Sequence, residues 1–179
     1  YREKERLLEK DMIHIIDGVF ANHQLKKFSK TINRSTEPFV SGYASKEGEG
    51  FFKNSEDHPN AFMCNTMKNY AHKFFELENT RGYEYWTHVN TKPNDTHQDK
   101  DEVAYLTKGI SRFPQCSTVF YLEVENLKGG ELVFTNGITV KPKVNRLVLF
   151  SPGLEHFVEE FTGHRVSIAV NPWSTKLYS

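Results

Sequence analysis

The sequence contains a close pair of side chains that could bind a metal ion, in the segment His97-Gln98-Asp99. In an extended segment, residues i and i+2 point to the same face, with Cα atoms roughly 6.5 Å apart. An imidazole and a carboxylate placed in this way can hold one ion between them. The alternative is an ordinary loop histidine beside an acid, because such pairs also arise by chance among 8 histidines and 23 acidic residues.

A third side chain of matching type, His156, follows the Pro152-Gly153 turn at the start of an apolar, strand-forming segment. Two histidines and one carboxylate, split into a close pair and a distant third residue, match the facial triad of non-haem Fe(II) oxygenases. That triad leaves three coordination positions open for other ligands. A lone strand histidine is otherwise a hydrogen-bonded core or surface residue, so the interpretation needs all three residues to meet.

Arg165 lies nine residues after His156, and Ser167 follows on the same strand face. If Thr162-Gly163 forms a two-residue hairpin turn, Glu160 faces Arg165, and His156 points to the same side as Arg165 and Ser167. His156 and Arg165 would then stand roughly 13 Å apart. A five-carbon diacid on the metal could span this gap to a guanidinium, which binds carboxylates bidentately. The alternative is an edge-strand arginine paired with Glu160.

The second half of the chain has the pattern of an antiparallel sandwich or barrel, with short β-rich segments separated by turn residues. The expected strands cover residues 83–90, 119–125, 131–135, 138–141, 146–151, 156–161 and 165–170.

The first half predicts helices around short strands. A charged surface helix is expected at 1–11, a short apolar segment at 12–16, and amphipathic helices at 21–33 and 61–77. The polar segment 45–60 and the segment 91–116 are expected to be loops, and one of them should order over the site when substrate binds. We expect one domain over 1–179, with helical support in 1–80 and a β core in 81–173.

Composition excludes several functional classes. Lys plus Arg and Asp plus Glu both total 23, so the net charge is zero and nucleic acid is not expected as a partner. No apolar run approaches the roughly 20 residues of a membrane span, and residues 1–11 lack the apolar stretch of a secretory signal. The chain begins at Tyr rather than Met, which leaves room for a removed leader or further domain. The two cysteines, Cys64 and Cys116, are expected to be structural and indicate a reducing, intracellular, cytoplasmic location.

These motifs together resemble the Fe(II)/2-oxoglutarate-dependent dioxygenases. The resemblance extends from Tyr83 to Trp173, and STVFYLEVENLKGGELVF (117–134) is similar to the sheet core of the prolyl-hydroxylase branch. The segment NRLVLFSPGLEHFVEEFTGHRVSIAVNPW continues the similarity through His156. The resemblance implies an α+β, mainly β fold, namely a double-stranded β-helix (jelly roll) flanked by N-terminal helices.

The resemblance also implies roles for individual residues. His97, Asp99 and His156 take the catalytic and iron-binding positions, and Tyr121, Arg165 and Ser167 take the 2-oxoglutarate positions. Asn90 and Trp173 are candidate substrate contacts, although Trp173 could instead cap the barrel.

The sequence departs from some members of the family. Arg165 and its spacing look like the oxygen-sensing prolyl hydroxylases, because procollagen-type enzymes carry Lys at the carboxylate-binding position. Asn171 replaces the second Arg of the nucleic-acid demethylases. The segment between Asp99 and Tyr121 is longer than in these relatives, which suggests a remodelled substrate entrance.

The implied function is hydroxylation of an unactivated C–H bond, most plausibly in a prolyl residue of a protein or peptide. It requires Fe(II), 2-oxoglutarate and O2, releases succinate and CO2, and makes ascorbate a further candidate cofactor. One alternative is a hydroxylase of a free amino acid or other small molecule. Another is a non-catalytic β-sandwich module that binds a metal.

Overall fold

The computed structural model describes residues 12–32, 59–93, 95–175 and 177. The helix expected at 1–11 therefore lies outside the described residues, as does the loop expected at 45–60 except for residues 59 and 60, which begin a helix. The prediction that the chain is one domain stays a prediction.

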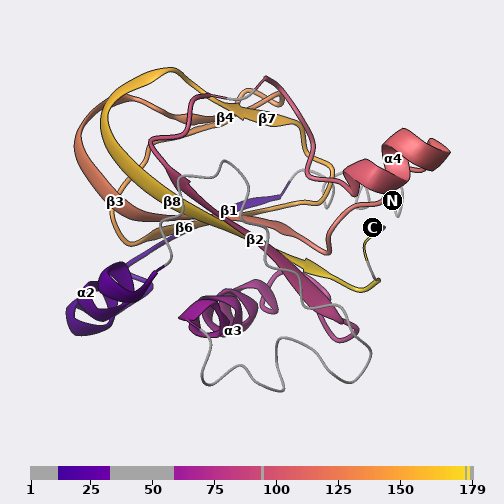
Figure 1. Cartoon of the computed structure of the whole chain (residues 1–179), viewed down its shortest axis with the longest axis horizontal. Helices are drawn as coiled ribbons and strands as arrows, with labels where there is room; N and C mark the ends of the chain where they lie inside the picture. Colours follow the sequence, from indigo (N-terminus) through magenta and orange to yellow (C-terminus); the bar gives the residue numbers. More distant parts are fainter. Residues whose placement is uncertain (1–11, 33–58, 94, 176, 178–179) are drawn as a thin grey trace, which may run out of the picture.

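Within these residues, eight strands form two antiparallel sheets that face each other (Figure 1). The larger sheet has the order β1-β6-β3-β8-β2, and the smaller sheet has the order β5-β4-β7. The larger sheet comprises β1 (Ile13–Asp17), β6 (Arg146–Phe150), β3 (Ser117–Gly129), β8 (Phe161–Trp173) and β2 (Gly82–Val89). The smaller sheet comprises β5 (Thr139–Val140), β4 (Leu132–Phe134) and β7 (His156–Val158). This is the expected mainly β, jelly-roll architecture, although the two sheets do not close into a continuous barrel.

Strand alternation divides the apolar side chains between two cores, one on each face of the larger sheet. On β3, Phe120 and Leu122 pack on the outer face against the helices, whereas Tyr121 points inward. The inner core lies between the sheets and includes Phe134, from the smaller sheet, and Phe150. The functional side chains described below belong to this inner face.

Two helices cover the outer face of the larger sheet, as the amphipathic patterns predicted (Figure 1). They are α2 (Asn22–Thr31) and α3 (Pro59–Ala71). Phe28 of α2 and Met63 and Met67 of α3 are buried in the outer core. The cysteines are also buried, and both are free thiols in the part of the chain that the structure describes. Among the described helices, none has the length and apolarity needed to cross a membrane.

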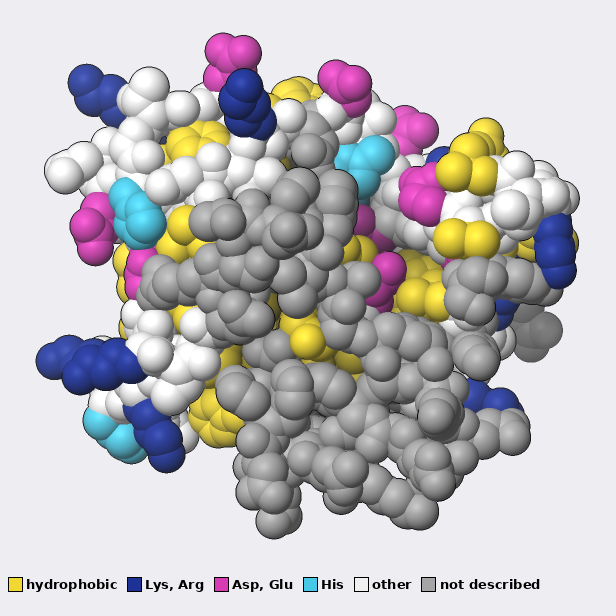
Figure 2. All heavy atoms as spheres, viewed as in Figure 1, with side chains coloured by type: hydrophobic (Ala, Val, Ile, Leu, Met, Phe, Trp, Pro, Cys, Tyr) yellow, Lys and Arg dark blue, Asp and Glu magenta, His cyan; other side chains and the backbone are white. Residues whose placement is uncertain are grey.

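The segment 91–116 is not a simple loop, because it contains a third helix, α4 (Glu102–Lys108). Asp101 caps its start by accepting a hydrogen bond from the Ala104 amide, and Gly109 ends it in the left-handed conformation (φ 65°). Both are sequence signals for helix ends, but the helix is short and lacks an apolar stripe. Figure 2 shows hydrophobic side chains over α4 at the right of the molecule, and Leu106 is 77% exposed.

The predicted hairpin between His156 and Arg165 is wrong. Strand β7 pairs with β4, and β8 pairs with β3 and β2, so Glu160 does not face Arg165 in a ladder. The chain instead passes from the smaller sheet to the larger one between Val158 and Phe161. A Gly-containing sequence between two alternating segments is compatible with a change of sheet as well as with a hairpin. Alternation specifies which face of a strand is buried and does not specify the strand with which it pairs.

Candidate functional site

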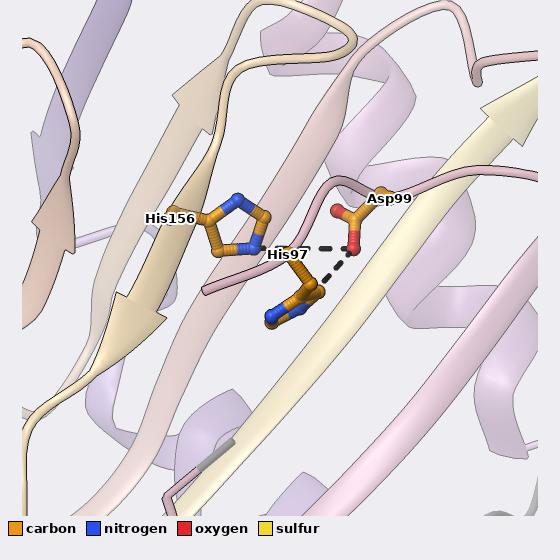
Figure 3. Close-up of side chains that lie close together, drawn as sticks. All are labelled: His97, Asp99 and His156. Carbon is orange, nitrogen blue, oxygen red and sulfur yellow. Dashed lines mark ion pairs between the residues drawn. The ribbon is translucent and has the colours of Figure 1, made fainter. Parts of the chain in front are cut away.

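The two predicted histidines and the aspartate meet at one end of the inner face (Figure 3). Asp99 Oδ1 lies 3.9 Å from Nε2 of His97 and 3.9 Å from Nε2 of His156. All three ligand atoms lie within 4.8 Å of one another. Two atoms that bind one first-row divalent ion lie up to about 4.2 Å apart, so each His–Asp pair already meets this limit.

The local backbone explains how residues so distant in sequence come together. His97 and His156 form an isolated antiparallel bridge, in which the His97 amide donates to the His156 carbonyl (3.0 Å) and the reverse bond measures 2.9 Å. His97-Gln98-Asp99 is therefore a single bridge followed by irregular backbone, within the segment 91–116 that was expected to be a loop. The Gln98 side chain donates to the Gly153 carbonyl, which ties this segment to the turn before β7.

Both imidazoles are oriented by backbone carbonyls. His97 Nδ1 donates to the Asp95 carbonyl (2.8 Å), and His156 Nδ1 donates to the Leu154 carbonyl (2.9 Å). These bonds place the protons on Nδ1 and leave both Nε2 lone pairs facing Asp99, which is the tautomer that binds a metal. Burial lowers the pKa of His156, with partial opposition from the Asp99 charge, and this favours the neutral imidazole.

Polar side chains from the neighbouring strands β3, β8 and β2 lie side by side on the same inner face. Tyr121 of β3 pairs across the sheet with Ser167 of β8, which pairs in turn with His88 of β2. We call His88, Ser167 and Tyr121 the first polar row. Arg165 lies one inward position along β8 from this row, only 5% exposed, with its guanidinium carbon 5.4 Å from the centre of the Tyr121 ring.

The first polar row and Arg165 contain polar atoms that need a partner. Tyr121 Oη, Ser167 Oγ and Arg165 Nε have no hydrogen-bond partner among the residues that the structure describes. Burial raises the pKa of Tyr121 and lowers the pKa of Arg165, so the buried guanidinium has a desolvation cost. Because an anion beside Arg165 would offset this cost and accept the free donors, the cluster fits a carboxylate.

His88 differs from the other members of the row in its electrostatics. Burial, with the Arg165 charge as the next cause, lowers the pKa of His88 to about 4, while Asp99 opposes the shift. His88 therefore offers a neutral imidazole between the guanidinium and the candidate metal ligands. Strand alternation over 83–90 places His88 on one face with Trp86 and Asn90, so the sequence already predicts it as a residue that could line the pocket.

A second polar row lies four residues further along the strands. We define it as Glu84 of β2, its partner Asn171 of β8, and Ser117 of β3. Asn171 Nδ2 and Ser117 Oγ have no hydrogen-bond partner within the described part of the chain. Burial raises the pKa of Glu84 to about 8, although the Trp173 hydrogen bond opposes the shift, and the nearby charges of Asp99 and Asp101 add to it.

The structure places the two candidate substrate residues differently. Asn90 is exposed at the end of β2 and hydrogen bonds to the backbone of Arg165. Trp173 is 1% exposed, and its Nε1 donates to Glu84 Oε2 (3.1 Å). Their contact with substrate stays a prediction. The second polar row was missed in the sequence because only cross-strand pairing brings its members together.

The chain belongs to the 2OG-Fe(II) oxygenase superfamily, whose family model matches residues 77–173. That range contains all of the predicted metal and cosubstrate residues. Membership implies Fe(II) and 2-oxoglutarate as cofactor and cosubstrate. His97, Asp99 and His156 fit the ion, and Arg165, Tyr121 and Ser167 fit a carboxylate.

Solved structures similar to this chain include prolyl hydroxylases. A viral collagen prolyl hydroxylase from Paramecium Bursaria Chlorella virus-1, in its 2OG complex, is 14% identical with a TM-score of 0.57, covering 92% of this chain and 96% of that chain. A prolyl hydroxylase from Trichoplax adhaerens, in complex with a hypoxia inducible factor oxygen degradation domain peptide fragment, is 11% identical with a TM-score of 0.59, covering 97% and 91%. A Pseudomonas putida prolyl-4-hydroxylase is 14% identical with a TM-score of 0.51, covering 93% and 94%.

At these identities the similarity establishes a shared fold. No curated protein sequence matches the chain significantly.

Proposed function

We propose that the protein hydroxylates a prolyl residue of a protein or peptide, using Fe(II), 2-oxoglutarate and O2 and releasing succinate and CO2. One observation carries the oxygenase part of the proposal. The His97–Asp99–His156 triad and the buried donors around Arg165 lie on the same inner face of a jelly roll. A module that only binds a metal has no need for buried, unpaired hydrogen-bond donors that could bind a carboxylate beside the metal, so this arrangement favours an enzyme.

His97, Asp99 and His156 would hold the iron and leave three positions for the cosubstrate and dioxygen. The chemistry that Fe(II) and 2-oxoglutarate supply when bound is oxidative decarboxylation coupled to insertion of one oxygen atom into a C–H bond. The Nδ1 hydrogen bonds of His97 and His156 would keep both imidazole rings oriented with Nε2 toward the ion.

Arg165 would bind the distal carboxylate of 2-oxoglutarate, with Tyr121 and Ser167 each donating a hydroxyl hydrogen bond. These groups are shielded from water, so charge-assisted bonds to them are stronger than on the surface. His88 stays neutral beside them and adds no competing positive charge. The chain's contribution is thus to bind, orient and exclude water, and no side-chain general base is required.

The prolyl substrate is supported by the fold of the neighbours, two of which are prolyl hydroxylases from a virus and from Trichoplax adhaerens. A free amino acid or other small molecule is the alternative substrate. A role for ascorbate stays a prediction.

The test is incubation of the protein with Fe(II), 2-oxoglutarate and a library of proline-containing peptides, read by mass spectrometry and by succinate release. We expect one peptide class to gain the mass of one oxygen atom, with succinate formed in equal amount. Asp99→Ala is the matched inactive control. If free amino acids gain oxygen and peptides do not, the small-molecule alternative replaces the prolyl one. Absence of succinate with every substrate would contradict the oxygenase assignment.

A further inference from the structure

Asn90 holds both backbone polar groups of Arg165. The Asn90 amide donates to the Arg165 carbonyl (2.9 Å), and Asn90 Oδ1 accepts from the Arg165 amide (2.8 Å). The regular β2–β8 ladder ends one pair earlier, at Val89 and Val166. Asn90 has φ 49°, so its backbone leaves the strand direction and its side-chain carbonyl takes the place of the backbone carbonyl in the next ladder bond.

Arg165 needs such a clamp because the ladder is irregular on its other side as well. The β3–β8 register shifts between Tyr121 and Glu123, one pair away from the pair Val124–Arg165. Arg165 therefore lies between the end of β2 and a register shift, where the sheet constrains the backbone less than in a regular ladder. Asn90 supplies the missing constraint on the β2 side.

The clamp continues outward as a chain of hydrogen bonds. Asn90 Nδ2 donates to His164 Nδ1 (3.3 Å), and His164 Nε2 donates to Glu123 Oε2 (2.9 Å). Glu123 Oε1 accepts from Ser29 Oγ of α2 (2.6 Å). Since Asn90 Oδ1 already accepts from the Arg165 amide, its NH2 group must face His164, and the His164 proton then lies on Nε2.

We propose that Asn90, supported by His164, is a positioning residue that aims the Arg165 guanidinium at the distal carboxylate of the cosubstrate. The proposal rests on the proposed function in that Arg165 binds 2-oxoglutarate. The guanidinium stands at the end of a long side chain, so a small backbone rotation at Arg165 displaces it by about 1 Å. Displacements above about 0.5 Å are enough to impair a preorganised site.

The test compares 2-oxoglutarate binding by the parent protein and four variants, measured by equilibrium dialysis of the metal-loaded proteins without oxygen. Asn90→Ala removes the bonds to the Arg165 amide and to His164, and should raise the 2-oxoglutarate Kd about tenfold. Asn90→Asp keeps an acceptor for the Arg165 amide and should raise it about threefold, as should His164→Phe. Asn136→Ala is the matched control, because Asn136 Oδ1 accepts a backbone N–H at an exposed turn.

Two further measurements distinguish a positioning role of Asn90 from a purely structural one. First, the KM for 2-oxoglutarate should rise in Asn90→Ala, while kcat at saturating 2-oxoglutarate falls less than twofold, because the error lies in carboxylate binding. Second, Asn90→Ala should lose preference for 2-oxoglutarate over 2-oxoadipate, which is one carbon longer, because a displaced guanidinium no longer matches the five-carbon length.

The outcomes distinguish this inference from the proposed function. If the parent protein binds 2-oxoglutarate but Asn90→Ala and Asn90→Asp bind it equally well, the positioning role is wrong and the proposed function stands. An equal rise of Kd in Asn136→Ala would also overturn the role. If the parent protein itself does not bind 2-oxoglutarate, both are overturned. Should Asn90→Ala not fold, Asn90→Asp and His164→Phe decide the question.

Discussion

Glu84 makes folding of this protein depend on pH in a direction opposite to that of most carboxylates. Burial in the inner face raises its pKa from 4.5 to about 8, and the nearby charges of Asp99 and Asp101 add to the shift. The hydrogen bond from Trp173 opposes the shift without cancelling it. Glu84→Gln keeps the shape and a hydrogen-bond acceptor for Trp173 but cannot ionise.

The sign and size of this pH dependence follow from the difference in proton binding between the folded and unfolded chains. Between pH 4.5 and pH 8 the carboxyl is ionised in the unfolded chain but protonated in the folded one, so unfolding releases a proton. Each pH unit in this window therefore lowers the stability of the parent protein by about 1.4 kcal/mol. The accumulated cost is about 2 kcal/mol at pH 6 and about 5 kcal/mol at pH 9, where the folded group is also ionised. Glu84→Gln avoids this cost.

The assay is urea unfolding of the metal-free protein at pH 6 and pH 9, comparing the parent with Glu84→Gln. Glu125→Gln, at an exposed position of β3, is the matched control for removing one carboxylate. We expect Glu84→Gln to be more stable than the parent at both pH values, with a gap that widens by about 3 kcal/mol at pH 9. If the stability difference between Glu84→Gln and the parent stays constant with pH, or if Glu125→Gln reproduces it, the pKa of Glu84 is not raised by folding.

Three further predictions concern the metal, the arginine that binds the cosubstrate, and Gly163 in β8. Asp99→Ala should abolish Fe(II) binding measured by dialysis, whereas Asp101→Ala, which removes the α4 cap and the ion pair with Arg112, should retain Fe(II) binding and lose at least about 1 kcal/mol of stability. Arg165→Ala should raise the 2-oxoglutarate Kd at least tenfold, because the loss of a buried charge partner costs about 2–5 kcal/mol. Arg165→Lys should give an intermediate Kd. An unchanged Kd in Arg165→Ala would refute the role of Arg165 in binding the cosubstrate. Gly163→Ala should lower the thermal midpoint more than Gly137→Ala, because both have positive φ but a Cβ at Gly163 would also collide with the Asn126 carbonyl; equal losses would mean that backbone strain alone matters.

Residue types and spacing predicted a metal-binding set of His97, Asp99 and His156, and the structure brings their ligand atoms within 4.8 Å of one another. Strand alternation also predicted that Arg165 and Ser167 share a face, and the structure places both on the inner face, where Tyr121 lies as well. Such inferences are local, and a two-residue period is insensitive to the partner strand.

Other features were decided only by the tertiary structure. The partner of β7 is β4 rather than β8, because burial of the His156 face between two sheets outweighs the local turn signal at Thr162-Gly163. Glu84 has an ordinary position in a strand pattern, and its raised pKa follows from what surrounds it after folding. Asn90 becomes a clamp on Arg165 because β2 ends opposite that residue. A sequence determines which groups a chain can offer, whereas cross-strand pairing determines which of them are buried together, and burial sets the strength of their interactions.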